Sequence, residues 1–215
     1  MAVARNVQEP APRYHSPLRA RQAAQTREAI IGAAIKLFAE RGWAATTLPM
    51  IASEAGTAVD TIYSTFGSKS ELLIAAVDVA IVGDDEAAPM VDRPDFALLG
   101  KGPRSERLRA GVRFTLGVYE RSVPILKALQ EAAASDTAAR ARLTQYDDDR
   151  RNVTAAGLAL ILGDTPPDET VDAMWALVSP EIFTYLTEGR SWPISRAETW
   201  FVHMSRSAIA KPTGA

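Results

Sequence analysis

Apolar residues near the start of the chain recur at the three- and four-residue spacing of amphipathic helices. The first predicted helix has Thr26 as its N-cap and ends at Gly42, a residue suited to the left-handed conformation. Its apolar stripe consists of Ile30, Ala33, Ala34, Leu37 and Phe38. A stripe of this width on a short segment predicts a helix that buries one face against neighbouring elements.

Three more short helices follow this one. Thr47 is the expected N-cap of the second, Gly56 the tight turn after it, and Gly67 the end of the third. Ser68 and Glu71 form a predicted capping box for the fourth helix. The apolar inner face consists of Leu48, Ile51, Ala52 and Ala55 in the second helix, of Val59, Ile62, Tyr63 and Phe66 in the third, and of Leu72, Leu73, Ala76, Val77 and Ala80 in the fourth. Two short helices about a tight turn are typical of a helix-turn-helix, which places its second helix in the major groove of DNA.

The remainder of the chain predicts more helices. Residues 83–102 are acidic and contain prolines, which predicts a loosely held connection. Helical patterns follow near 104–121, 123–134, 137–162, 168–188 and 195–210, and no alternating strand pattern of useful length interrupts them. The predicted fold is all-α. We expect a helix-turn-helix domain at 25–72 and a helical domain at 73–211.

Charge is distributed unevenly along the 215 residues. Residues 1–27 hold five arginines and one glutamate, a formal charge of +4, whereas the whole chain carries −2. With three prolines and no helical periodicity, residues 1–24 are expected to form a disordered basic arm, either a DNA contact or a solvated leader. The acidic and basic run at 147–151 is interpreted as a solvated helix face.

Composition narrows the function classes. The chain has no cysteine, which excludes disulfides and thiolate chemistry, and no apolar stretch long enough to span a bilayer. The polar N-terminus lacks the apolar core of a signal peptide, so a cytoplasmic protein is expected. Only His15 and His203 are present, and no phosphate-binding loop or nucleophile motif occurs. We therefore expect no enzyme activity, no cofactor and no metal.

Three consecutive segments, LFAERGWAATTL, IASEAG and TIYSTFGSKSELL, together resemble the TetR family of transcriptional repressors. The resemblance covers about residues 26–75, and WALVSPEIFTYL and SWPISRAETWFVHM resemble the last two helices of one subgroup. It implies a homodimer that binds a palindromic operator in double-stranded DNA and is released by a small-molecule effector. Thr57, Asp60 and Thr65 depart from the residues common in the family at these places.

A DNA-contacting surface is predicted on the third helix and its flanks. Its residues are Thr47, Ala58, Val59, Asp60, Thr61, Tyr63, Ser64, Thr65 and Lys69. The resemblance assigns phosphate contacts to Thr47, Tyr63 and Lys69. Val59 and Tyr63 are also candidates for the core. Asp60 either accepts a hydrogen bond from a cytosine amino group or points outward along the groove.

The resemblance also implies a dimer interface and an effector pocket. Expected interface residues are Met174, Val178, Ile182, Phe183, Trp200, Phe201 and Met204. Expected pocket residues are Phe114, Tyr119, Leu126, Tyr146 and Trp175. The alternative for both sets is that these residues only pack in the hydrophobic core of their own protomer. An alternative function is a helical dimer whose helix-turn-helix contacts a protein instead of DNA.

Overall fold

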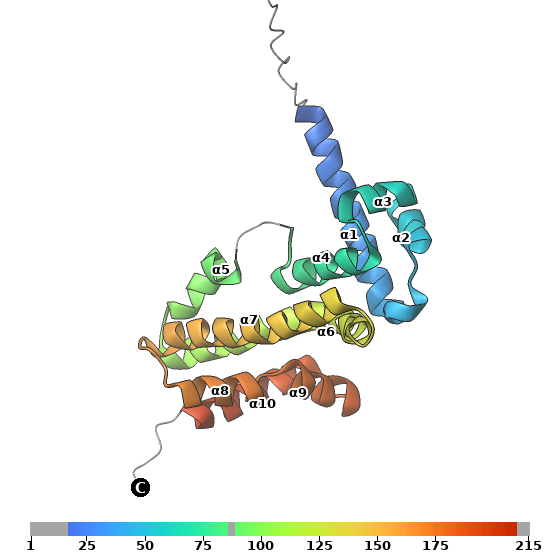
Figure 1. Cartoon of the computed structure of the whole chain (residues 1–215). Coiled ribbons are helices and arrows are strands. Elements are labelled where there is room, and N and C mark those ends of the chain that lie inside the picture. The colour runs from blue at the N-terminus through green and yellow to red at the C-terminus, as the bar shows by residue number, and fades with distance from the viewer. Residues whose placement is uncertain (1–16, 86–88, 210–215) are drawn as a thin grey trace, which may run out of the picture.

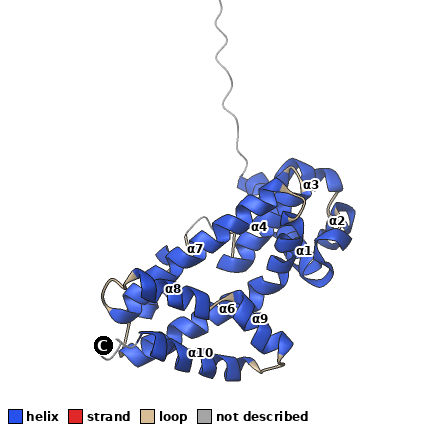
Figure 2. Cartoon of the chain, turned by 60° about the horizontal axis from the view of Figure 1, so that its bottom comes forward, coloured by secondary structure: helices blue, strands red, loops and turns tan. Residues whose placement is uncertain are grey.

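The computed structural model describes residues 17–85 and 89–209, and within these ranges every regular element is a helix (Figures 1 and 2). The α-helices are α1 (Pro17–Ala45), α2 (Leu48–Ala55), α3 (Val59–Phe66), α4 (Lys69–Val82), α5 (Pro94–Ala97), α6 (Arg104–Ala133), α7 (Thr137–Leu162), α8 (Asp168–Leu177), α9 (Pro180–Thr184) and α10 (Ile194–Ile209). Shorter turns are η1 (Met90–Asp92), η2 (Leu98–Gly100) and a π-helical turn η3 (Tyr185–Gly189). The all-α prediction is confirmed. No described helix combines the length and apolar character needed to cross a membrane.

The ends of the first four helices follow the capping residues that the sequence predicts. Gly42 breaks α1 with φ 74° and ψ −178°. The side chain of Thr47 accepts a hydrogen bond from the Met50 amide at the start of α2, and Gly56 ends α2 in the left-handed region. Ser68 caps α4 by accepting from the Glu71 amide. These local interactions fix where the helices around α3 begin and end.

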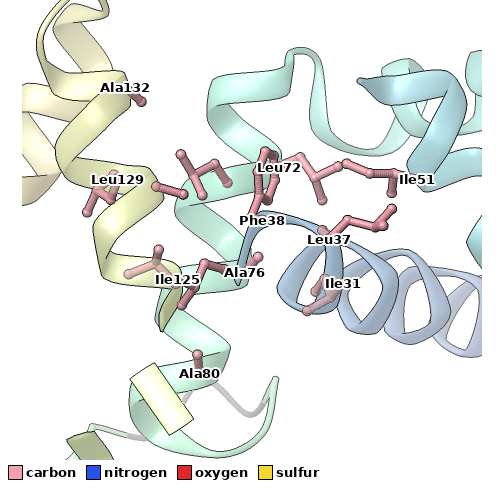
Figure 3. Close-up of a cluster of buried hydrophobic side chains, with 14 of the residues drawn as sticks. Ile31, Leu37, Phe38, Ile51, Leu72, Ala76, Ala80, Ile125, Leu129 and Ala132 are labelled. Atoms are coloured by element: carbon pink, nitrogen blue, oxygen red, sulfur yellow. The ribbon is translucent and has the colours of Figure 1, made fainter. Parts of the chain in front are cut away.

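One apolar core holds α1 to α4 together and continues into the second half of the chain. Phe38, Ile51 and Leu72 are completely buried, as is Ile62 of α3. Figure 3 shows Leu129 and Ile125 of α6 beside the α4 side of this cluster. The predicted domain boundary after residue 72 falls inside α4, whose buried residues lie on both sides of it. The buried apolar residues of α4 on both sides of that boundary belong to this one core, in which α4 packs against α1 and α6.

A second apolar core lies among α6, α7, α8, α9 and α10. α6 and α7 are long helices joined by a short turn, and they lie side by side in the middle of the molecule (Figure 1). α9 and α10 pack against α6 on the side turned away from the helix-turn-helix, and α8 packs against α7 and α10 (Figure 1). Phe201 of α10 is completely buried there. Helices of the second half of the chain thus surround α6.

Three predicted boundaries are wrong. α1 begins at Pro17, so residues 17–24 are helical and Thr26 lies inside the helix, where its hydroxyl donates to the Gln22 carbonyl. Pro124 lies inside a continuous α6, although a break was expected there. The predicted helix at 168–188 is interrupted before Pro180, because a proline disfavours helical backbone in the residue before it. Residues 1–16 of the expected disordered arm lie outside the described residues.

The segment 83–102 also differs from its prediction as a loosely held connection. It contains η1, α5 and η2, and the side chains of Phe96 and Leu99 are 2% and 5% exposed. The Phe96 ring meets the Phe114 ring of α6 edge to face, with centroids 5.8 Å apart. These apolar anchors tie the segment against α6 and α7.

Candidate nucleic-acid interface and effector cavity

α3 buries one side chain and turns a polar face outward. Ile62 fixes the helix to the core, whereas Ala58, Asp60, Tyr63, Ser64 and Thr65 are exposed and Val59 and Thr61 are partly buried. Tyr63 is 53% exposed, so of the two interpretations of this ring the structure favours the surface one. The expected DNA-contacting residues of α3 therefore share one helix and, apart from Val59 and Thr61, lie at the surface.

Hydroxyl groups on this face have defined hydrogen-bond directions. Ser64 and Thr65 both donate to the carbonyl of Thr61, at 3.0 and 2.7 Å. In this state their oxygens, like the carboxylate of Asp60, are acceptors toward the outside. Such a face fits the amino groups that cytosine N4 and adenine N6 present in the major groove.

The two flanking residues are placed differently from each other. Thr47 is exposed, and its hydroxyl oxygen accepts from Met50, which leaves its own proton for an external acceptor. The Lys69 ammonium donates to the Trp43 carbonyl at 2.6 Å and lies 4.0 Å from the centroid of the Trp43 ring. Burial lowers the pKa of Lys69 below its ordinary value. Lys69 therefore holds the end of α1 to the start of α4, at the edge of the α3 face.

The start of α1 is a basic element that the sequence did not predict as a helix. Arg19 and Arg21 are exposed on it, and Figure 1 shows this part of α1 extending past α3. Arg27 pairs with Asp85 at 2.6 Å and lies over the Phe66 ring at 4.8 Å. Arg19 and Arg21 therefore leave positive charge at the exposed start of α1, whereas the charge of Arg27 is paired with Asp85.

Comparisons with known proteins agree with this geometry. The family model for bacterial regulatory proteins of the TetR family matches residues 30–76. The uncharacterized HTH-type transcriptional regulator YerO of Bacillus subtilis is 44% identical over 57 residues, which are 26% of this chain and 20% of YerO. The chain thus spans about a fifth of that relative. A TetR-family regulator from Streptomyces coelicolor is 25% identical with a TM-score of 0.60, covering 85% of this chain and 81% of that one.

A further crystal structure, of a protein assigned to the TetR family in Syntrophomonas wolfei, covers 89% of this chain and 99% of its own. It has a TM-score of 0.67 at 14% identity, which shows the shared fold alone. Residues 30–76 thus match the DNA-binding module of the TetR family, and the helices that follow, the regulatory half, have the fold of TetR-family structures.

The regulatory half contains a cavity of about 640 Å³ between α6 and α7. The segment 89–99, the end of α4 and parts of α8 complete its wall. Apolar side chains dominate the wall, including Phe96, Leu99 and Ile161. The volume lies in the range typical of small-molecule sites.

The cavity contains three of the five expected pocket residues. Phe114, Tyr119 and Tyr146 belong to its wall, whereas Leu126 lies in the core shared with α1 and α4, and Trp175 lies outside the wall. Whether any of them contacts an effector stays a prediction.

Both wall tyrosines are buried. Tyr119 donates to the Val178 carbonyl at 2.7 Å, and burial raises its pKa to about 12. Burial raises the pKa of Tyr146 as well. Both phenols are therefore neutral hydrogen-bonding groups at physiological pH.

Two arginines in the wall were missed by the sequence interpretation. The 147–151 run was expected to be a solvated face, yet the Arg150 side chain is only 11% exposed. Its Nη1 donates to the Trp175 carbonyl at 2.6 Å, and its guanidinium lies 4.4 Å from the Trp175 ring centroid. Arg142, one turn before Tyr146, is 15% exposed. The spacing 142, 146, 150, 153, 157 and 161 continues one helical face, and this signal would have placed both arginines inward.

The predicted interface residues divide into two groups. Met174, Val178, Phe183 and Phe201 are buried inside the protomer's own core, which is the alternative that the sequence left open. They form no surface on which a second subunit would pack. Ile182, Trp200 and Met204 are partly exposed. Of the adjacent aromatics on α10, Phe201 points inward and Trp200 reaches the surface.

Proposed function

We propose that this chain is a sequence-specific DNA-binding repressor that acts as a homodimer and leaves its operator when a small molecule binds. The observation that carries the proposal is the α2–Gly56–α3 unit, in which α3 is anchored by Ile62 and keeps an exposed polar face. The match of residues 30–76 to the TetR family model supports the regulatory role. The exposed acceptors of α3 supply base contacts, and Thr47 with the basic start of α1 supplies contacts to phosphates.

Dimer formation is proposed because one short helix contacts too little DNA for a specific site. Two copies of α3 about 34–36 Å apart would read the two halves of a palindrome. The surface for this contact comprises the partly exposed Ile182, Trp200 and Met204 together with Tyr185, which is 63% exposed. A symmetric contact between two copies of this surface would bury the apolar area that the protomer leaves open.

Release by an effector is proposed because the regulatory half contains a cavity large enough for one. A ligand changes DNA binding only when it favours the DNA-incompetent arrangement. Reversing a 99:1 preference requires about 5.5 kcal/mol of differential binding. α4 supplies two residues of the wall, Ile81 and Val82, and also packs against α1, so it connects the cavity to the DNA-binding module.

Fluorescence anisotropy on duplexes from the gene's own upstream region tests the proposal. We expect saturable binding to a short palindrome that random DNA does not compete away, with affinity falling steeply as salt rises. Tyr63→Ala should weaken operator binding at least tenfold. Leu98→Ala is the matched control, since Leu98 is comparably exposed at 50% but lies in the regulatory half.

Two results would count against the proposal. Weak binding without sequence preference, on both upstream DNA and duplexes selected from a random pool, would favour a protein partner for α3. Equal operator affinities for Tyr63→Ala and the unmodified protein would mean that α3 is not the helix that recognises the operator.

A further inference from the structure

We infer that the effector is an amphipathic anion whose acidic group binds Arg142, and that Arg142 transmits this event to α4 through Asp78. The inference rests on the proposed function, because it assigns a ligand class and a relay to the proposed effector cavity. It is carried by two buried guanidinium groups in an otherwise largely apolar wall and by one ion pair that joins this wall to α4.

The cavity wall changes character along α7. Its charged and amide side chains, Arg142, Asp149, Arg150 and Asn152, come from the first two-thirds of the helix. From Ala156 to Ile161 the wall residues of α7 are apolar or glycine. At 1.5 Å per residue, α7 continues for about 16 Å from Arg150 to Ile161, and its wall residues are apolar or glycine over the last part of this distance. A ligand that fits this wall has a polar group at one end and an apolar body at the other.

Unsatisfied donors define the charge of the polar group. The Nη1 atom of Arg142 is buried and has no hydrogen-bond acceptor among the described residues, with Asp149 at 3.8 Å. The Nε atom of Arg150 is likewise buried without an acceptor there, with Asp147 at 4.0 Å. Both groups donate only, so a carboxylate or another oxyanion is the chemistry that satisfies them.

Neighbouring carboxylates do not cancel the charge of the arginines inside the cavity. The side chains of Asp78, Asp147 and Asp149 are 48%, 58% and 52% exposed, whereas those of Arg142 and Arg150 are 15% and 11% exposed. Water and salt screen exposed charges much more than buried ones. The two guanidinium groups are therefore the least screened charges of this cluster, which favours an anion beside them.

Arg142 is also the side chain that links the cavity wall to α4 by an ion pair. Its Nε and Nη2 atoms donate to the same oxygen of Asp78, at 2.8 and 2.6 Å. Asp78 lies on α4, whose first residue, Lys69, holds Trp43 at the edge of the α3 face. An acidic ligand that draws the guanidinium toward itself weakens the bond to Asp78. The ligand thereby favours states in which α4 is less tightly held, which is the differential contact that coupling requires.

The ligand class is tested with three probes that share a twelve-carbon chain: dodecanoate, dodecan-1-ol and dodecyltrimethylammonium, each below its micellar concentration. Binding is followed by isothermal titration and by the intrinsic fluorescence of the four tryptophans, of which Trp175 stacks on Arg150. We expect dodecanoate to bind about tenfold to a hundredfold more tightly than the alcohol, the range for a charge-assisted hydrogen bond. Arg142→Gln should remove most of this preference. Arg113→Gln, on an arginine 67% exposed on α6, should keep it.

Folding of the variants is controlled within the same set. The double variant Arg142→Gln, Asp78→Asn removes both charges of the pair, so it leaves neither partner as an unpaired charge and should also lack the preference. Equal affinities for the three headgroups, or binding of none of them, would overturn the ligand class.

The relay is tested by DNA affinity with and without saturating dodecanoate. Asp78→Asn should keep dodecanoate binding at or above the unmodified level and lose its effect on DNA affinity. An undiminished effect in Asp78→Asn would overturn the relay. The probe measurements need no DNA, so a protein that prefers dodecanoate but binds no operator would refute the proposed function and leave the ligand class standing.

Discussion

Gly42→Ala tests how the end of α1 is held against α6. Gly42 has φ 74° and ψ −178°, a backbone region that is essentially restricted to glycine and costs other residues about 1–3 kcal/mol. A Cβ there would lie 2.8 Å from Oε2 of Glu131, the oxygen that accepts from the Trp43 amide at 2.8 Å. Displacing this carboxylate removes a partly exposed charged hydrogen bond, worth about 1–2 kcal/mol. We expect a total loss of roughly 2–5 kcal/mol.

Gly56→Ala is the matched control. Gly56 also has positive φ, but its conformation is the ordinary left-handed one, and a Cβ there meets nothing within 4 Å. Its replacement should cost about 1–2 kcal/mol. Urea denaturation followed by circular dichroism gives both free energies of unfolding.

A double-mutant cycle separates the two contributions at Gly42. In a Glu131→Ala background the carboxylate is already gone, so Gly42→Ala should cost about 1–2 kcal/mol less than it does in the unmodified protein. The reasoning is refuted if Gly42→Ala costs no more than Gly56→Ala, or if the cycle is additive within about 0.5 kcal/mol.

Four further outcomes are expected. Ile62→Ala should lower the free energy of unfolding by about 2–5 kcal/mol, since this side chain is fully buried; urea titration measures it. Thr46→Val should cost about 1–3 kcal/mol in the same assay, because its buried hydroxyl shares its one proton between the carbonyls of Gly42 and Leu37, at 2.8 and 3.1 Å. Tyr119 is an acid whose pKa is raised on folding to about 12, so its contribution to stability is complete below pH 10 and is lost as pH rises through 12; Tyr119→Phe should flatten that part of the pH profile. Asp60→Asn should tighten binding to random duplexes at low salt by removing repulsion from phosphates, and an unchanged anisotropy curve would place Asp60 away from the backbone.

The sequence predicted the helix-turn-helix well because its signals are local. Thr47, Gly56 and Ser68 act on backbone groups within a few residues of themselves, so their roles depend little on the remaining fold. The stripe that contains Phe38 matches the buried face of α1 because helical periodicity alone fixes which residues share a face. The departure at Pro17 has the opposite cause: α1 extends beyond its apolar stripe, where periodicity gives no signal.

The cavity was less predictable because it depends on contacts between distant segments. Phe96 and Leu99 come from a segment whose acids and prolines indicate a loop, and only their docking on α6 and α7 shows their role. Arg150 lies in a run of charged residues. The charge of this run led to the prediction of a solvated face, although the position of Arg150 in the helical repeat puts it on the apolar face of α7. Leu126 was misplaced because an apolar residue on α6 faces either the cavity or α4, and sequence spacing does not distinguish the two.

Polar links between the two halves of the molecule converge on α4 and its neighbours. Ser70 donates to Asp136, which caps α7, and Arg142 of α7 pairs with Asp78. Apolar packing of α4 against α6 is continuous with the core of the DNA-binding module, so it resists independent movement of that module. The polar links are different, because a ligand can offer one of their groups another partner. The new hydrogen bond then replaces the old one at a small net cost in free energy. In the proposed mechanism, control of α3 by the cavity therefore rests on the exchangeable ion pair between Arg142 and Asp78 of α4, while the shared core keeps the movement of α4 and α3 concerted.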